Sequence, residues 1–297
     1  MPQENMQWTP RQDILTFEEI GRLANLFAQM GVNKVRLTGG EPTTRKDLTH
    51  LIQKLRNISG IGPLLLTTNG AALERTAVQL RDAGVTGLNI SLDTLDRQRF
   101  HEITRRDQLE QVMRGIKAAV AAQFESLKIN VVVMSGINDH EMCDFISTFR
   151  DDPIEIRFIE FMPFLSNDWE RGKMVPYAQM RSRIESAYSL RPIDSGPNAV
   201  AKEFEVEGAT ARIGFITSMT EHFCDGCNRI RLTADGHLKA CLFSRTGPSL
   251  RDAMRAGARD DELESMIREA VNTKWAAHPP MTQLTQTNDR PMISIGG

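Results

Sequence analysis

Short segments rich in Val, Ile and Leu alternate with longer amphipathic segments through the first 161 residues, at a spacing of about thirty residues. Parallel strands need a crossover of a dozen or more residues, usually a helix, so this alternation predicts βα units and a parallel sheet. The expected strands are 34–38, 64–68, 87–92, 128–134 and 155–161, and the expected helices are 16–30, 46–57, 73–83, 108–123 and 141–150. Such units form either a doubly wound sheet or an open or closed barrel, and the pattern is compatible with both.

The rest of the sequence follows another pattern, which separates a first region, 1–170, from a second region, 171–297. After an expected helix at 177–188 comes a loop with Pro192, Gly196 and Pro197. Two strand pairs are expected next, 202–206 with 211–217 and 229–233 with 237–243, followed by helices at 249–256 and 260–272. The sequence Ala234-Asp235-Gly236 is typical of a hairpin turn. We therefore predict a parallel α/β region followed by a smaller α+β domain.

The overall charge of the chain gives little attraction for polyanions. The 297 residues carry a formal net charge of −2 with a pI near 6.3, so no global field favours nucleic acid or an anionic membrane. No segment approaches the ~18 consecutive apolar residues of a membrane span. The first five residues are polar and lack the basic start and apolar core of a signal peptide. We expect a cytoplasmic protein without nucleic-acid or membrane partners, in which local Arg and Lys clusters hold any anionic ligand.

Three of the four cysteines lie close together in the sequence, as Cys224-x2-Cys227-x13-Cys241. Short spacing in a cytosolic chain favours a metal site over disulfides. Three thiolates hold zinc if a fourth ligand joins them, and His222 and His237 are the candidates. Three thiolates also hold three irons of a four-iron cluster and leave the fourth iron open to a substrate. The spacing alone is compatible with both metals.

Two arginines follow the second cysteine, and the i, i+2 spacing of Arg229 and Arg231 places both on one face of the expected strand. Two guanidinium forks beside a metal suit a polyphosphate or nucleotide, although a solvated charged face is the alternative. Residues suited to ligand binding also occur along the expected parallel strands, whose C-terminal ends form the binding edge in such folds. At the strand C-terminal ends lie Gly39 and Gly40, which let a ligand approach the backbone, Thr67 to Gly70, and Ser91 and Asp93; on the next two strands lie Lys128 and Asn130, and Arg157 and Glu160. Five strands that each deliver a polar group to one edge predict a binding site there.

Five motifs, in this order along the chain, resemble those of the GTP 3′,8-cyclase family of radical S-adenosylmethionine enzymes. They are Arg-Leu-Thr-Gly-Gly-Glu-Pro at 36–42, Thr-Thr-Asn-Gly at 67–70, Asn-Ile-Ser-Leu-Asp at 89–93, Arg-Phe-Ile-Glu-Phe-Met at 157–162 and Cys-Asp-Gly-Cys-Asn-Arg-Ile-Arg-Leu at 224–232. The C-terminal Ile295-Gly296-Gly297 is similar to that family's double-glycine tail. The resemblance covers essentially the whole chain. It implies molybdenum cofactor biosynthesis, a partial (β/α)6 TIM-like barrel and a C-terminal α+β iron–sulfur domain with a second four-iron cluster.

The resemblance also implies roles for individual residues. Cys224, Cys227 and Cys241 are expected to ligate the second cluster, whose open iron faces the guanine. The expected GTP ligands are Arg36, Thr67, Lys128, Arg157, Arg229 and Arg231, and the expected S-adenosylmethionine contacts are Gly40, Ser91 and Met162. In this family a 5′-deoxyadenosyl radical takes the ribose 3′ hydrogen of GTP, and the sugar radical attacks C8 of guanine to give 3′,8-cyclo-7,8-dihydro-GTP. Gly296 and Gly297 are expected to reach into the barrel and assist this step.

The sequence departs from the family near its start. It has no cysteine before Cys143, whereas the family holds its first cluster on a Cys-x3-Cys-x2-Cys loop after the first barrel strand. We therefore expect the first strand and that loop to be missing, the strand at 34–38 to be an unpaired edge, and this chain not to form the radical. A truncated gene is the favoured interpretation. The alternatives are a catalytically dead paralogue that binds GTP and keeps only the C-terminal metal site, and a zinc-stabilised structural domain.

The family resemblance implies several partners. The substrate is GTP, and an electron donor supplies the reductive step. A cyclic pyranopterin monophosphate synthase receives the product by hand-off. The family also leads us to expect a homodimer.

Overall fold

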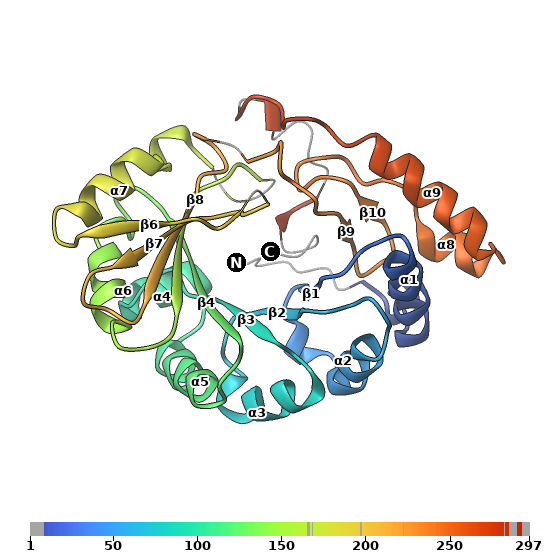
Figure 1. Cartoon of the computed structure of the whole chain (residues 1–297), viewed down its shortest axis with the longest axis horizontal. Coiled ribbons are helices and arrows are strands. Elements are labelled where there is room, and N and C mark those ends of the chain that lie inside the picture. The colour runs from blue at the N-terminus through green and yellow to red at the C-terminus, as the bar shows by residue number, and fades with distance from the viewer. Residues whose placement is uncertain are drawn as a thin grey trace.

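The computed structural model describes residues 9–164, 167, 169–196, 198–221, 223–281, 283–284 and 290–292. Its main feature is a curved sheet with strand order β1-β2-β3-β4-β5-β8-β7-β6 (Figure 1). The strands are β1 (Val35–Leu37), β2 (Leu64–Thr68), β3 (Gly87–Ser91), β4 (Ser126–Val133), β5 (Glu155–Glu160), β6 (Leu190–Ile193), β7 (Lys202–Val206) and β8 (Arg212–Ile216). β1 to β5 pair in parallel, so the predicted α/β architecture is confirmed.

Helices follow the strands along the outer side of the sheet (Figure 1). They are α1 (Phe17–Gln29), α2 (Leu48–Arg56), α3 (Leu73–Ala83), α4 (Arg97–Thr104), α5 (Leu109–Ala121), α6 (Met142–Thr148) and α7 (Tyr177–Glu185), with short 3-10 turns at Arg11–Asp13, Pro42–Thr44 and Arg171–Lys173. α1 begins with a capping box, in which Thr16 Oγ1 accepts from the Glu19 N–H and the Glu19 carboxylate accepts from the Thr16 N–H. The sequence pattern does not predict α4, because Phe100 is the one residue of this helix that is buried.

The two faces of the parallel sheet differ in polarity. Along β4, Leu127 and Ile129 are buried against the helices, while Lys128 and Asn130 on the other face are only half-buried. The same alternation places Thr67 of β2 on the inner face. A closed TIM barrel fills its interior with branched apolar side chains. The polar inner face of this sheet is instead suited to line a ligand site.

The second half of the chain extends the sheet. β7 and β8 form the predicted antiparallel pair, and β8 also pairs in parallel with β5, which the sequence pattern does not predict. Phe215 of β8 is fully buried between Phe158 and Phe204, and this packing fixes β8 beside β5. The predicted loop around Pro192 is wrong, because β6 pairs there with β7. Proline is tolerated at this position because β6 is the edge strand of the described sheet.

The C-terminal segment contains a hairpin of β9 (Arg231–Leu232) and β10 (Leu238–Lys239), followed by α8 (Leu250–Arg255) and α9 (Asp260–Asn272). The predicted turn is confirmed, and Gly236 takes φ +82 there. Both strands are shorter than predicted, because antiparallel pairing joins only Leu232 to Leu238 and Arg231 to Lys239.

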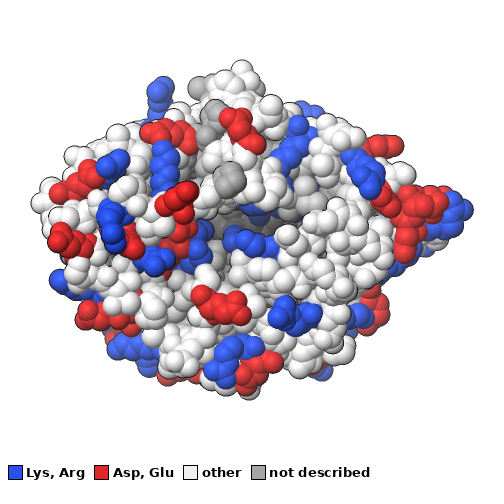
Figure 2. Space-filling view, viewed as in Figure 1, with Lys and Arg blue, Asp and Glu red and all other residues white. Residues whose placement is uncertain are grey.

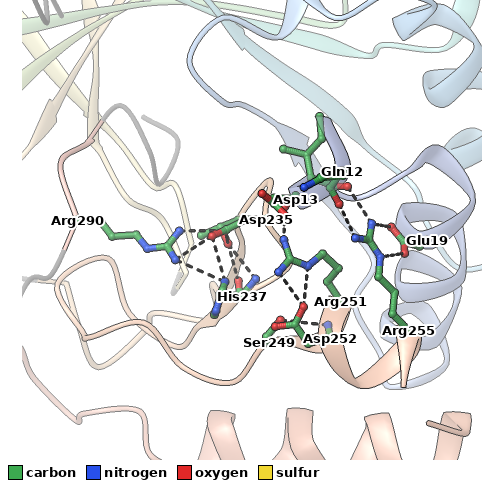
Figure 3. Close-up of polar contacts among 12 residues, drawn as sticks. Gln12, Asp13, Glu19, Asp235, His237, Ser249, Arg251, Asp252, Arg255 and Arg290 are labelled. Carbon is green, nitrogen blue, oxygen red and sulfur yellow. Dashed lines mark hydrogen bonds and ion pairs between the residues drawn. The ribbon is translucent and has the colours of Figure 1, made fainter. Parts of the chain in front are cut away.

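Helices α8 and α9 pack against α1, beside the β1 end of the sheet (Figure 1). Arg255 of α8 donates from Nε to the Glu19 carboxylate at 2.7 Å and from Nη2 to the carbonyl of Ile14 at 3.1 Å (Figure 3). Arg22 of α1 reaches Asp260 of α9 at 2.9 Å. The C-terminal segment therefore covers the side of the molecule at β1, whose one strand partner among the described residues is β2. None of the described helices combines the length and the hydropathy that a bilayer crossing requires.

Candidate functional site

Four arginines from three separate parts of the sequence lie within electrostatic reach of one another: Arg36 of β1, Arg157 of β5, and Arg229 with Arg231 of the C-terminal segment. Desolvation by the surrounding protein, followed in order by the charges of Arg157, Arg229 and Arg231, lowers the pKa of Arg36 to about 10. Part of the Arg36 side chain is exposed to solvent, as expected for a side chain on the wall of a hollow. Figure 2 shows such a hollow near the centre of this face, with basic side chains around it. Burial and the nearby Arg229 likewise lower the pKa of Arg231 to about 10.

A buried carboxylate balances part of this positive charge. Glu155 at the start of β5 accepts from Lys128 Nζ, and from Arg157 Nε at 2.5 Å. Burial alone would raise the pKa of Glu155, but Arg157 and Lys128 outweigh it and lower the pKa. Arg157 also reaches Glu203 at 3.4 Å. The sequence reasoning missed Glu155, although the alternation Glu155-x-Arg157 places both side chains on the inner face of a strand.

Two polar atoms on the same inner face have no hydrogen-bond partner within the described part of the chain. They are Thr67 Oγ1 of β2 and Asn130 Oδ1 of β4, and both are buried. Burying an unsatisfied polar atom costs about 1–3 kcal/mol, so such atoms call for a functional explanation. Strand register places Thr67 and Lys128 on either side of Asn89 across β2, β3 and β4. The sequence-predicted residues Thr67, Lys128 and Arg157 thus lie on three strands of one surface.

The residues predicted from resemblance to contact S-adenosylmethionine lie at the C-terminal ends of three parallel strands. Gly40 follows β1, Ser91 ends β3 and Met162 follows β5. Gly40 and Ser91 are exposed, and a Cβ built on Gly40 would meet no atom within 4 Å. Met162 packs in a small cluster with Phe164 and Phe243. The edge at which these residues lie is the one that the sequence predicts as a binding site.

A carboxylate joins two of the recognised motifs at this edge. Glu41 Oε1 accepts from Thr68 Oγ1 at 2.8 Å, and Glu41 Oε2 accepts from the Asn69 N–H at 2.7 Å. Glu41 also accepts from the Thr43 N–H at 3.1 Å, which fixes the turn after Gly40. The loops that follow β1 and β2 are therefore held together by one side chain.

A second buried carboxylate holds the chain segment that precedes the cysteines. Glu160 at the end of β5 is fully buried and accepts from the N–H groups of Tyr177, Met219 and Thr220 at 3.0, 2.7 and 3.0 Å. Tyr177 begins α7, and Met219 and Thr220 follow β8. The sequence predicts Glu160 as a polar group at the binding edge. The structure shows it holding the segment that leads from β8 to Cys224.

Cys224, Cys227 and Cys241 are half-buried free thiols that influence one another's ionisation. Burial raises the pKa of Cys224, and the other two thiols raise it further, against a hydrogen bond from the backbone N–H of His278. Burial would also raise the pKa of Cys227, but Arg229 and Lys274 lower it overall. Within the part of the chain that the structure describes, no three Cys, His, Asp or Glu side chains form a group able to hold a single metal ion. The influence of Cys227 and Cys241 on Cys224 nevertheless places the three thiols in one neighbourhood.

Four sequence-predicted candidates remain, and the structure places one of them, His237. His237, a candidate zinc ligand, lies in the hairpin turn and pairs with Asp235, with 3.2 Å between Nδ1 and Oδ2. Asp235 also holds Arg290 through two contacts of 2.9 Å (Figure 3). Gly296 and Gly297, as well as His222, lie outside the described residues.

An open groove of about 640 Å³ lies beside this site, near the ends of β7 and β8. Asp194, Glu203 and Glu221 line it together with one lysine, Lys202. The Lys202 ammonium pairs with Glu221, which leaves the lining acidic overall. This groove does not suit a phosphate ligand, in contrast to the arginine-lined hollow.

Comparison with known proteins gives consistent matches along the chain. Residues 3–149 match the Radical SAM superfamily, and residues 154–280 match the family described as Molybdenum Cofactor Synthesis C. The chain is 46% identical over 298 residues to "GTP 3',8-cyclase, mitochondrial" of Arabidopsis thaliana, covering 100% of this chain and 76% of that protein. It is 41% identical to "GTP 3',8-cyclase" of Moorella thermoacetica, covering 100% and 92%.

Other relatives are longer than this chain. "Molybdenum cofactor biosynthesis protein 1" of Mus musculus is 44% identical, and the chain spans 100% of its own length but 47% of the mouse protein. Among solved structures, Streptococcus suis SuiB matches with a TM-score of 0.56 at 14% identity, over 94% of this chain and 62% of SuiB. At that identity the likeness concerns the fold alone. The sequence matches show that the chain belongs to the GTP 3′,8-cyclase family, which joins a radical SAM region to a molybdenum cofactor synthesis C region.

Proposed function

We propose that this chain binds GTP in the arginine-lined hollow for conversion to 3′,8-cyclo-7,8-dihydro-GTP in molybdenum cofactor biosynthesis. The observation that carries the proposal is the gathering of Arg157, Arg229 and Arg231 around Arg36. Like charges held together in a half-buried space cost free energy, and a highly anionic ligand removes this cost. The names of the Arabidopsis thaliana and Moorella thermoacetica relatives support the same reaction.

The arginines suit the triphosphate because guanidinium groups bind phosphate oxygens in a bidentate manner. Arg36 supplies charge from the sheet and Arg231 from the C-terminal hairpin. Glu155 keeps Lys128 and Arg157 ordered on the inner face before the ligand arrives. Thr67 Oγ1 and Asn130 Oδ1 then find partners in the polar groups of the nucleoside, which accounts for their burial without partners in the described chain.

The three thiols fit an iron–sulfur cluster by the chemistry of their donor set. Cys224, Cys227 and Cys241 would hold three irons of a four-iron cluster, since three neighbouring thiols are a ligand set that leaves the fourth iron open. The positive charges of Arg229 and Lys274 beside Cys227 favour the thiolate form that ligation requires. S-adenosylmethionine and iron–sulfur clusters, when bound, supply the radical chemistry that characterises the superfamily.

We assign the S-adenosylmethionine contacts to Gly40, Ser91 and Met162, because they lie at the C-terminal ends of β1, β3 and β5, which form one edge of the sheet. Gly296 and Gly297 are proposed to assist catalysis from the C-terminal tail. The reaction needs an electron donor, and its product would pass to a cyclic pyranopterin monophosphate synthase. We also propose that the protein acts as a homodimer.

Calorimetric titration with GTP tests the binding step directly. The titration measures binding and requires neither a cluster nor turnover. Replacing both arginines of the hairpin, Arg229→Ala with Arg231→Ala, is expected to weaken GTP binding by about 3 kcal/mol, or about 100-fold, since two charge-assisted contacts are lost.

Arg268→Ala is the matched control. Arg268 lies on the outside of α9, where it pairs with Glu264 of the same helix, and its side chain is 63% exposed. This variant is expected to bind GTP as the unchanged chain does. Equal affinity of the double variant and the control would show that the hairpin arginines do not bind GTP.

A further inference from the structure

The segment that carries Cys227 and Arg229 lacks regular secondary structure. Between Thr220 and the start of β9 at Arg231, the described residues form neither helix nor strand. The turn is closed by a hydrogen bond from the Cys227 N–H to the Cys224 carbonyl at 3.0 Å. Residues beyond this turn therefore depend on contacts from other parts of the chain to hold their conformation.

One side chain supplies several of these contacts. Lys274 Nζ donates to the carbonyl of Cys227 at 2.5 Å and to the carbonyl of Arg229 at 2.9 Å. The same ammonium lies 3.4 Å from Cys227 Sγ. An ammonium group has three donor hydrogens, and these three acceptors match that number. The contact thus spans Cys227 and Arg229, a proposed metal ligand and a proposed GTP ligand.

The element that carries Lys274 is well anchored. α9 ends at Asn272, two residues before Lys274, and it buries Leu263, Ile267 and Ala270 against α1 and α8. Four residues after Lys274, the backbone N–H of His278 donates to the Cys224 thiol. The short stretch 274–278 therefore contacts both cysteines of the Cys224-x2-Cys227 turn from one side.

We propose that Lys274 is a positioning residue that fixes Cys227 and Arg229 relative to each other and so couples metal loading to GTP affinity. The inference rests on the proposed function of the hollow and the thiols. Without Lys274, the segment 227–229 samples conformations in which Arg229 does not face the hollow. The measured GTP affinity then falls in proportion to the fraction of chains that keep Arg229 facing the hollow. Metal bound at Cys227 restrains the same segment and recovers part of that fraction.

Lys274→Met tests this inference because it keeps the length of the side chain and removes all three donors. In the metal-free full-length chain we expect GTP binding, measured by calorimetry, to weaken about tenfold. After anaerobic loading with iron and sulfide, the same substitution is expected to weaken GTP binding by about threefold or less. Iron loss to a chelator is expected to be faster in the variant than in the unchanged chain. Circular dichroism and thermal midpoints establish that each variant is folded.

Arg268→Met, on the exposed side of α9, is the matched control and is expected to change none of these quantities. Lys274→Gln retains two N–H donors without the charge, and we expect an intermediate loss of affinity. An equal loss in metal-free and loaded Lys274→Met chains would overturn positioning, because it would mean that Lys274 contacts GTP itself or acts by charge alone. Unchanged affinity in both states would also overturn it. If the unchanged chain fails to bind GTP, the proposed function fails instead.

Discussion

Glu155→Gln removes the buried negative charge that holds Lys128 and Arg157, and its cost follows from the geometry of the site. The Glu155, Arg157 and Lys128 side chains are 10%, 10% and 19% exposed, so water screens their interaction poorly. Removing one member of a buried ion pair costs about 3–5 kcal/mol, because the remaining charge stays buried without compensation. Glutamine keeps one acceptor oxygen, so we expect a loss near the lower limit, about 3 kcal/mol at pH 7.

The loss depends on pH in a defined direction. The folded-state pKa of Glu155 lies below its ordinary value because Arg157 and Lys128 outweigh the effect of burial. A lowered carboxyl pKa stabilises the folded state above the ordinary value of about 4.3, and this contribution disappears as the pH falls below it toward the folded-state value. The difference between the unchanged chain and Glu155→Gln is therefore expected to be full at pH 7 and to shrink in acid.

Urea unfolding followed by circular dichroism at pH 7 and at pH 4 measures both effects. Glu205→Gln on β7 is the matched control, because Glu205 also pairs with an arginine, Arg191, but in a pair that is 39% and 80% exposed. The control is expected to change stability by about 0.5 kcal/mol or less. If both variants unfold at the same urea concentration, or if the cost of Glu155→Gln does not decrease in acid, the reasoning about the buried pair is refuted.

Two further substitutions test how the fold holds the site. Glu160→Gln is expected to cost about 3 kcal/mol, because a fully buried carboxylate that accepts from three backbone N–H groups is replaced by a group that is partly a donor. Glu170→Gln, whose side chain is 70% exposed, is the control in the same urea assay, and equal stability of the two would contradict this role for Glu160. Gly115→Ala is expected to cost at least about 1 kcal/mol, since the added Cβ would lie 2.4 Å from the Gly70 carbonyl oxygen, between α5 and the turn after β2. Gly172→Ala, where a Cβ meets no atom within 4 Å, should leave the thermal midpoint unchanged, and a Gly115 variant as stable as this control would argue against the close approach.

Local chemistry in the sequence determined most of the elements. The capping box at Thr16 and Glu19 and the turn at Gly236 act between residues that are close in the chain, so their sequence signals lead directly to structure. The alternation of apolar strands and amphipathic helices likewise predicted that β1 to β5 pair in parallel, although not the order of the strands. The five motifs sufficed to identify the family, which the matches over the full chain confirm.

Tertiary structure decided the contacts between residues that are far apart in sequence. The parallel pairing of β8 with β5 depends on the burial of Phe215 between Phe158 and Phe204, and no local pattern in 211–217 specifies that neighbour. Tertiary structure likewise brings Lys128 to Glu155 and Lys274 to Cys227. A single sequence shows which side chains can carry charge or bind metal. The free energy of burying distant apolar surfaces together determines which of these side chains meet. Only the folded chain reveals that arrangement.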